Sequence, residues 1–381
     1  MYVRALRLVD FRTYEQVEIG LEPGVTTLVG PNGQGKTNVV EAVGYLSTLG
    51  SHRVAADGPL VRTGADRATI GARVVRDDRE VQLEVEINPG KANRARLNRS
   101  PLPRARDLLG QLRTVVFAPE DLALVKGDPS ERRRFLDDLL VQLWPRLAGT
   151  RADYDRIIKQ RNALLKSAGA ARRADSAEVE RTLSVWDDQL ATVGAELSAA
   201  RVALVASLRP HVTQAYAMLA GGPDAVSSAD VSIDYVPSVG RQLGEQTDRA
   251  TWREALIDAV AARRREELDR GVTLVGPHRD DLALALGDLP VKGYASHGEA
   301  WSTAVALRLA SFEVLRADHD DPVLILDDVF AELDESRRSR LAEAVGDFEQ
   351  VLITAAVFDD VPESLAAHVV RIRAGAVVTD E

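Results

Sequence analysis

The segment from Gly30 to Thr37 fits the pattern G-x-x-x-x-G-K-[ST], which is typical of a phosphate-binding loop (P-loop). The glycines let successive backbone N–H groups turn toward one anion, and the N-terminus of the following helix adds a favourable potential. Lys36 would supply a charge to the β- and γ-phosphates of ATP, and the Thr37 hydroxyl would complete a Mg²⁺ shell. The predicted ATP-binding positions of the P-loop are Gly30, Pro31, Asn32, Gly33, Gln34, Gly35, Lys36 and Thr37.

Two adjacent acids, Asp327 and Asp328, end an apolar run that begins at Pro322. The run predicts a strand with Asp327 at its carboxyl end, where open α/β sheets bind ligands. Asp327 suits the same Mg²⁺ ion as Thr37, and Asp328 could polarise the attacking water. A helix N-cap and its neighbour would also give two acids in a row. We predict Lys36, Asp327 and Asp328 as catalytic residues, with ATP and Mg²⁺ as cofactors.

Residues 296–299, Ser-His-Gly-Glu, precede an apolar-periodic segment that predicts a helix. Ser296 and Glu299 have the spacing of a capping box. The same turn could present a hydroxyl, the bare N–H of Gly298 and a helix dipole to a phosphate, and the two interpretations are compatible. We therefore include Ser296, Gly298 and Glu299 among the predicted nucleotide-binding residues.

Basic residues gather in two places, although the chain has 48 Lys+Arg against 58 Asp+Glu and a net charge of −10. The first segment contains no acid, and its basic residues are Lys91, Arg94, Arg96, Arg99, Arg104 and Arg106. The second lies in a helical section and contains Arg151, Arg156, Lys159, Arg161, Lys166, Arg172 and Arg173. Either segment could hold duplex phosphates, or could be a solvated strand edge or helix face. The first segment has no interleaved aromatic residue and the second has only Tyr154, which disfavours recognition of single strands by base stacking.

The elements that must position these residues follow from the hydrophobic periodicity. A helix over 38–46 follows the P-loop, as the motif requires. Alternating or fully apolar runs predict strands at 3–8, 25–29, 81–87, 114–117, 272–275, 282–286, 323–326, 351–354 and 369–372. The two strand-rich ends look incomplete alone, so we predict one α/β ATPase head formed from both chain ends.

The middle of the chain is predicted to be mainly helical, with Ser130 as N-cap of a helix over 131–143, an interruption near 168–175, and a helix over 251–270. Apolar residues repeat at steps of four and three at Trp186, Leu190, Val193, Leu197, Ala200 and Leu204. This seam fits a helical hairpin or small bundle, and equally an amphipathic core helix. The predicted division is therefore 1–125 and 271–381 for the head and 126–270 for an inserted arm.

Composition excludes several classes of protein. The chain has no Cys, which excludes a disulfide scaffold, a thiol nucleophile and a Cys-based zinc site. No run approaches the ~18 consecutive apolar residues of a membrane span, and the N-terminus has no signal-peptide core. We therefore expect a cytoplasmic protein without a membrane partner.

The order of these motifs, together with Ala331-Glu332-Leu333-Asp334, resembles ABC-type ATPase heads of the SMC/Rad50-like branch and, more closely, the RecF family. Further phrases similar to that family lie at 50–53, 117–122, 126–133 and 275–281, so the resemblance spans the chain to about residue 355. By this resemblance, residues 296–299 form the signature turn, which closes over the nucleotide in the P-loop of a second copy.

The resemblance implies an ATP-gated head-to-head homodimer with weak ATPase activity that acts as a switch. It implies binding of DNA at gaps or single-strand/duplex junctions with a RecR-like mediator, and indirectly RecA, in gap repair, replication recovery and SOS induction. Alternatives are an ABC transporter ATPase subunit, an SMC-like clamp in another pathway, and a metal nuclease. A transporter subunit usually lacks so long an insertion, and the histidines and acids suggest no ligand cluster beyond Asp327 and Asp328.

Three positions depart from the wider ABC pattern: Asp328 where many members carry Glu, Thr354 in place of a switch His, and Gln111 as the nearest Gln upstream of the 117–121 segment. Each departure favours slow turnover. Arg53 and Arg279 are candidates for contact with the nucleotide or for coupling, and Arg279 could instead form a structural ion pair.

Overall fold

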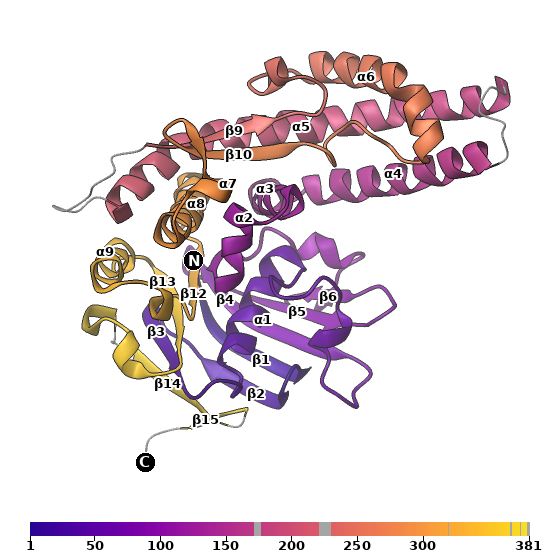
Figure 1. The fold of residues 1–381 in the computed structure, drawn as a ribbon. Coiled ribbons are helices and arrows are strands. Elements are labelled where there is room, and N and C mark those ends of the chain that lie inside the picture. Colours follow the sequence, from indigo (N-terminus) through magenta and orange to yellow (C-terminus); the bar gives the residue numbers. More distant parts are fainter. Residues whose placement is uncertain (171–176, 221–229, 319, 366–367, 374, 379–381) are drawn as a thin grey trace. The chain divides into compact units, whose positions relative to one another are not determined.

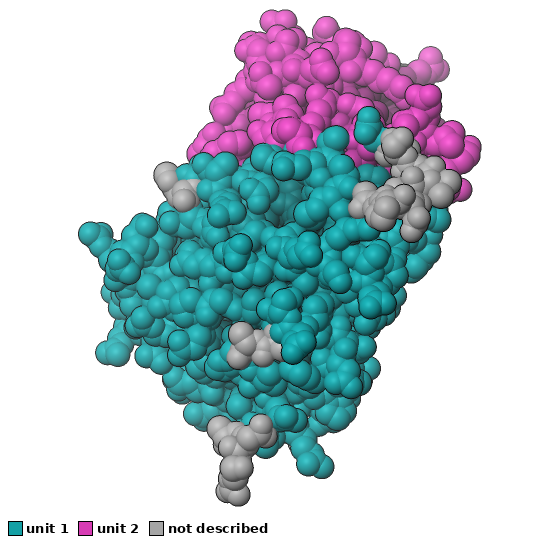
Figure 2. Space-filling view, turned by 90° about the vertical axis from the view of Figure 1, so that its left-hand side faces the viewer, with its two compact units in different colours: residues 1–122, 211–230, 296–381 teal, residues 123–210, 231–295 magenta. Residues whose placement is uncertain are grey.

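The computed structural model describes residues 1–170, 177–220, 230–318, 320–365, 368–373 and 375–378, which form two compact units (Figures 1 and 2). Unit 1 comprises 1–122, 211–230 and 296–381, and unit 2 comprises 123–210 and 231–295. The predicted division differs from this one because residues 271–295 fall in unit 2. Their strand β10 (Asp281–Leu286) pairs with β9 (Val231–Val236) of the same unit, which explains the difference.

The first sheet of unit 1 has the order β15-β14-β3-β13-β12-β8, and only the edge strand β15 runs antiparallel. Its strands are β3 (Gly24–Val29), β8 (Thr114–Phe117), β12 (Val323–Asp327), β13 (Gln350–Ala355), β14 (His368–Arg373) and β15 (Ala376–Val378). The central strands β12 and β13 are buried along their whole length, as continuous apolar runs predict. The strands predicted at 25–29, 114–117, 323–326, 351–354 and 369–372 are therefore confirmed.

The second sheet of unit 1 is antiparallel and has the order β2-β1-β4-β5-β6-β7. Its strands are β1 (Tyr2–Phe11), β2 (Tyr14–Gly20), β4 (Ala68–Arg76), β5 (Arg79–Ile87), β6 (Arg94–Leu97) and β7 (Ser100–Pro101). The alternation of β5 puts Leu83, Val85 and Ile87 into the core and leaves charged residues on the other face.

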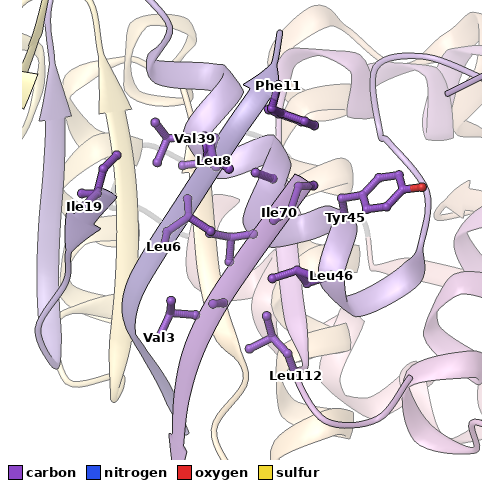
Figure 3. Close-up of a cluster of buried hydrophobic side chains, with 14 of the residues drawn as sticks. Val3, Leu6, Leu8, Phe11, Ile19, Val39, Tyr45, Leu46, Ile70 and Leu112 are labelled. Atoms are coloured by element: carbon purple, nitrogen blue, oxygen red, sulfur yellow. The ribbon is translucent and has the colours of Figure 1, made fainter. Parts of the chain in front are cut away.

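The core of unit 1 includes residues of both sheets and of helix α1 (Lys36–Thr48) (Figure 3). Leu6 and Ile70 of the antiparallel sheet, Leu46 of α1 and Ile325 of β12 are all fully buried in one cluster. The other long helices of this unit are α8 (His297–Asp318) and α9 (Glu335–Val345). Because α1 is buried along most of its length, its first residues hold a fixed position, and these residues end the P-loop.

Unit 2 is mainly helical, with a small sheet of order β11-β10-β9. Its elements are α3 (Pro129–Leu143), α4 (Leu147–Ala170), α6 (Arg249–Arg270), α7 (Val291–Tyr294) and β11 (Leu289–Pro290), with α2 (Leu122–Lys126) and α5 (Ala177–Ala220) extending from it into segments of unit 1. The predicted seam lies on α5, where Leu190, Leu197 and Leu204 are buried and the three other members are half-buried. Short 3₁₀ helices lie at Gly58–Leu60, Ala105–Leu108, Pro119–Asp121, Arg241–Leu243, Phe330–Glu332, Phe358–Asp360 and Glu363–Leu365.

Two local predictions are wrong. Residues 272–275 do not form a strand, because side chains accept their backbone hydrogen bonds: the N–H of Thr273 donates to Asn162 Oδ1 at 2.7 Å, and that of Leu274 donates to Glu267 Oε1 at 2.8 Å. Helix α3 begins at Pro129, so Ser130 is inside the helix and is not its N-cap. Proline fits the first helical position because its missing N–H has no partner there.

Among the residues that the structure describes, one helix, α5, is long and apolar enough to cross a membrane by length and composition, with a mean hydropathy of 1.3 over 18 residues. In the folded chain 61% of that stretch is buried. A core helix of a soluble protein passes the same test, so this helix is weak evidence for a membrane span.

Candidate nucleotide-binding site

The P-loop joins the buried strand β3 to α1 and is built around close backbone approaches. A Cβ at Gly30 would lie 2.1 Å from the carbonyl oxygen of Ile372, and one at Gly35 would lie 2.7 Å from the Tyr14 hydroxyl. Gly35 also has a φ of +112°, which L-residues rarely adopt. Glycine is therefore required at both positions, and the loop has the geometry that its motif predicts.

Lys36 is a buried cation with neutral partners. Its side chain is 5% exposed, and Nζ donates to the Pro31 carbonyl at 3.2 Å and to Asn32 Oδ1 at 3.4 Å. Burial lowers the pKa of Lys36, although Asp328 and Asp327 act in the opposite direction. No carboxylate of the described residues lies within ion-pair distance of Nζ. Such a cation favours an anion next to it.

Asp327 lies at the carboxyl end of β12, where two hydroxyl groups donate to the same oxygen. Thr37 Oγ1 donates to Asp327 Oδ1 at 3.0 Å, and Thr354 Oγ1 donates to it at 2.6 Å. His52 Nε2 lies 3.9 Å from Oδ2. Burial favours the protonated acid, but the His52 ring and the two hydroxyl groups outweigh this effect and lower the pKa of Asp327. The site therefore holds a buried carboxylate that stays ionised.

The parallel register explains why residues so far apart in sequence meet here. β13 lies between β3 and β12 and pairs Thr354 with Leu28 on one side and with Asp327 on the other. The carboxyl ends of these three strands thus lie at one edge of the sheet, next to the start of the P-loop. The predicted meeting of Thr37 and Asp327 is observed.

Asp328 follows in a strained backbone conformation, with a φ of +57°. Its N–H donates to Thr354 Oγ1 at 3.0 Å and to the Thr354 carbonyl at 3.3 Å. Burial raises the pKa of Asp328; Lys36 opposes this shift, and Asp327 adds to it. Thr354 thus fixes both acids, one through its hydroxyl proton and the other through its oxygen lone pair. The residue predicted only as a missing switch His is a positioning residue.

The residues at this edge fit a Mg²⁺ ion held together with phosphate oxygens. Mg²⁺ is usually bound by one or two protein oxygens, substrate phosphates and waters, and not by a cage of acids. Thr37, in the first turn of α1, supplies a hydroxyl, and Asp327, at the end of β12, supplies an ionised carboxylate. The described residues contain no group of three or more His, Cys, Asp or Glu that could hold a metal alone.

The signature turn begins α8 with the predicted capping box. The N–H of Ser296 donates to Glu299 Oε2 at 2.8 Å, and the N–H of Glu299 donates to Ser296 Oγ at 3.2 Å. These bonds lower the pKa of Glu299, so Glu299 holds the turn. Within the described residues, no hydrogen bond or ion pair joins the turn to Lys36 or Asp327.

The structure also places three further residues that the sequence analysis singled out. Gln111 precedes the amino end of β8, opposite to the edge that carries Asp327, so it does not belong to the site. Arg53 donates through Nη1 to Asn38 Oδ1 at 3.1 Å and is 3.2 Å from Glu41 Oε2. Arg279 lies in unit 2, where Nε and Nη2 donate to the Thr273 carbonyl, and among the described residues the alternative of a structural ion pair is not observed.

The first basic segment forms an exposed strand and turn whose cations differ in pairing. Arg94 lies 3.5 Å from Glu86 and Arg96 lies 2.7 Å from Glu84, both across the β5–β6 pair. Arg99 donates to Gln82 Oε1 at 3.4 Å. In the described part of the chain no ion pair engages the remaining three, Lys91, Arg104 and Arg106.

In the second basic segment, the burial of Arg161 makes it unavailable to DNA. Arg161 is fully buried, with Nε on Asp187 at 2.8 Å and Nη2 on Glu267 at 2.5 Å. Arg151 and Arg156 pair with aspartates, and Lys159 and Lys166 are exposed. The other two candidates, Arg172 and Arg173, lie outside the described residues.

Sequence reasoning missed the shell behind the P-loop helix. Glu41 is fully buried in α1, and Arg12 donates to both of its oxygens, at 2.8 and 2.5 Å. Ser51 Oγ donates to the same carboxylate at 2.5 Å. This ion pair could have been predicted from Glu41 itself, which is a single acid inside the apolar run Val39-Val40-Glu41-Ala42. A carboxylate buried in such a run needs a cationic partner.

The chain is similar to known proteins of one kind. Residues 2–374 match the family model described as the RecF/RecN/SMC N terminal domain. The chain is 59% identical over 380 residues to the DNA replication and repair protein RecF of Frankia alni, covering 99% of both chains. It resembles a solved structure titled as the recombination mediator protein RecF-ATP in the RecFOR pathway, with a TM-score of 0.88, 26% identity, and coverage of 100% and 98% of the two chains. It also shares the fold of an Smc head domain from Pyrococcus furiosus, with a TM-score of 0.54, 16% identity, and coverage of 99% and 95%.

Proposed function

The chain belongs to the RecF family, and on this premise we propose that it is an ATP-dependent DNA-binding protein of recombinational repair. Two copies would close on two ATP molecules, each held by the P-loop of one copy and the signature turn of the other. Slow hydrolysis would release the pair, because ADP lacks the phosphate that both copies hold. The names of its relatives, which include a repair protein and a recombination mediator with ATP, support this proposal.

The buried, unneutralised Lys36 is the observation that carries the proposal. A desolvated ammonium group next to a glycine-built loop has its charge satisfied only when an anion enters the loop. Asp327 has the complementary need, because it is buried and ionised with neutral hydrogen-bond donors. A triphosphate with a divalent cation satisfies both groups at once.

The chain's own residues divide the chemistry in a simple way. Lys36 would bind the β- and γ-phosphates, and Thr37 and Asp327 would hold Mg²⁺, which neutralises phosphate charge when bound. Asp328, with its raised pKa, would orient the attacking water and accept its proton. Aspartate is shorter than the Glu of many relatives of this fold, so we expect slow turnover suited to a switch.

DNA would be held through its backbone phosphates at a gap or a single-strand/duplex junction. The unpaired cations Lys91, Arg104 and Arg106 are the best candidates, because Arg94 and Arg96 already face glutamates. By family resemblance the protein would act in the cytoplasm with a RecR-like mediator and help to load RecA. Its proposed roles are gap repair, replication recovery and SOS induction.

The test measures molecular mass and duplex-DNA affinity with ATP, ADP and a non-hydrolysable analogue. We expect dimers and tight DNA binding with ATP and the analogue, and monomers with ADP. Lys36→Ala should abolish the response to ATP, and Ser296→Arg should bind ATP as a monomer without forming dimers. Arg7→Ala, which removes an exposed cation of β1 in the same unit, is the matched control for loss of a positive charge. ATP-dependent dimers of Lys36→Ala would contradict the role of the P-loop.

A further inference from the structure

Arg337 lies directly on the signature turn. A Cβ placed on Gly298 would be 2.8 Å from Nη1 and 3.1 Å from Nη2 of Arg337, so the guanidinium group packs against the backbone of this glycine. Any other residue at 298 would displace the arginine. Gly298 therefore does more than expose a backbone N–H: it leaves room for a positive charge at the turn.

The arginine is held in place from its own helix. Arg337 lies in the first turn of α9, and Nη1 donates to Asp334 Oδ2 at 2.5 Å. Asp334 is the N-cap of this helix and also accepts from the backbone N–H of Arg337 at 2.9 Å. The Arg337 side chain is 28% exposed, so it remains partly accessible to a ligand.

Arg337 supplies a positive charge beside the signature turn. Glu299 is occupied by the capping box, and the charge of Arg337 contributes to lowering its pKa. A guanidinium group has five N–H donors in a planar fork, which suits phosphate oxygens. Among the described residues Asp334 is the one hydrogen-bond acceptor for the Arg337 side chain, through one of those donors.

We propose that Arg337 binds the terminal phosphate of the ATP held in the P-loop of a second copy, together with Ser296 and the N–H of Gly298. The inference rests on the proposed function and adds a charged residue to its composite site. Since ADP lacks this phosphate, Arg337 would contribute to the ATP dependence of dimer formation. Its bond to Asp334 also connects the turn to the loop that follows Asp327 and Asp328.

The test uses mixtures of variants, because a composite site takes its two halves from different copies. The Arg337→Ala variant has an intact P-loop but lacks the arginine of the signature turn. The Lys36→Ala variant has the arginine but lacks the phosphate-binding lysine of the P-loop. Neither variant alone can form a complete site. A mixed pair has one complete site, made from the P-loop of the Arg337→Ala copy and the turn of the Lys36→Ala copy.

We expect Arg337→Ala to bind ATP as a monomer with unchanged affinity and to dimerise about tenfold to a hundredfold more weakly, the range for losing hydrogen bonds to a charged group. Mixing it with Lys36→Ala should restore ATP-dependent dimers and ATPase activity. Gly298→Ala should behave like Arg337→Ala, and Arg337→Lys should retain part of the dimerisation. Arg338→Ala is the matched control, because the side chain of Arg338 donates to the Leu333 carbonyl.

Three outcomes would overturn the inference: normal dimerisation of Arg337→Ala, loss of its monomer ATP affinity, or no recovery in the mixture with Lys36→Ala. A parallel mixture of Ser296→Arg with Lys36→Ala separates this failure from that of the proposed function. If the Ser296→Arg mixture recovers and the Arg337→Ala mixture does not, Arg337 acts within its own copy. If neither mixture recovers, the composite site itself is wrong. Unfolding curves of each variant show that the fold is intact.

Discussion

Two buried cations, Arg161 in unit 2 and Lys36 in unit 1, have opposite surroundings. In unit 2, Arg161 has two carboxylates, of Asp187 and Glu267, and the Thr273 hydroxyl as partners. In unit 1, Lys36 is almost equally buried but has only a carbonyl and an amide oxygen, both beyond 3.1 Å. A buried cation that stabilises the fold is paired with carboxylates of the same chain. A buried cation that binds an anionic ligand has no such carboxylate partner before the ligand binds. Burial alone does not separate the two, but the partners do.

The largest expected effect is on stability in the arm. Arg161→Ala leaves Glu267 buried without its cation, so we expect the free energy of unfolding to fall by about 3–5 kcal/mol. Urea unfolding followed by circular dichroism measures this loss. Arg156→Ala, which removes an exposed cation of the same helix, should cost less than about 1 kcal/mol. Similar losses in both variants would show that the buried network is not what stabilises the arm.

Lys36→Met tests the other buried cation. Here we expect the stability of the fold to be kept or increased while ATP binding is lost. Removing a buried charge without an ionic partner should leave the free energy of unfolding unchanged or higher. ATP affinity should fall about a hundredfold, since charged hydrogen bonds to two phosphates are lost. Calorimetric titration with ATP and urea unfolding of the same sample measure both. A variant that unfolds more easily would place Lys36 among the structural cations.

A buried neutral base in unit 2 extends the comparison to pH. His278 Nε2 lies 3.2 Å from the Thr273 carbonyl and Nδ1 lies 2.9 Å from the Tyr154 hydroxyl, so the ring donates at one nitrogen and accepts at the other. Burial lowers the pKa of His278 to about 4.

The unfolded chain therefore binds a proton near pH 6.5 that the folded chain takes up only near pH 4, so stability falls as the pH drops through this window. We expect a loss of about 2–3 kcal/mol across it. Thermal unfolding from pH 7 to pH 4, with His278→Gln as the control, measures the share of this residue. An equal slope in both proteins would assign the loss to other groups.

Thr354→Val tests the residue that positions both acids. The variant keeps the shape of the side chain but removes the donor to Asp327 Oδ1 and one acceptor of the Asp328 N–H. We expect kcat for ATP hydrolysis to fall about tenfold, the cost of one such bond, with a smaller change in KM. Thr354→Ser should restore the rate. A change in KM alone would mean that Thr354 serves binding and not the alignment of the acids.

The features set by local spacing could be predicted from the sequence, whereas those set by long-range contacts could not. The P-loop, the strand ending at Asp327 and the capping box at Ser296 all depend on neighbours within a few residues, and they appear where predicted. Residues 271–295 belong to unit 2 because β10 pairs with β9, and no local sequence pattern predicts this pairing. The role of Arg337 could not be predicted for the same reason, because its contact with Gly298 is between two helices, α8 and α9.

The smallest expected effects concern the exposed cations, where pairing again separates roles. If DNA phosphates contact Lys91, the log–log slope of affinity against salt should decrease in magnitude by about 0.9 in Lys91→Ala, the contribution of one phosphate contact. Arg96→Ala should change the slope less, because Arg96 already pairs with Glu84 at 2.7 Å. Titrations of duplex DNA at several salt concentrations measure both slopes. Equal slopes in the two variants would mean that ion pairing within the sheet does not decide which cations bind DNA. The relation between a cation's partners and its role would then hold for the buried residues and not for the exposed ones.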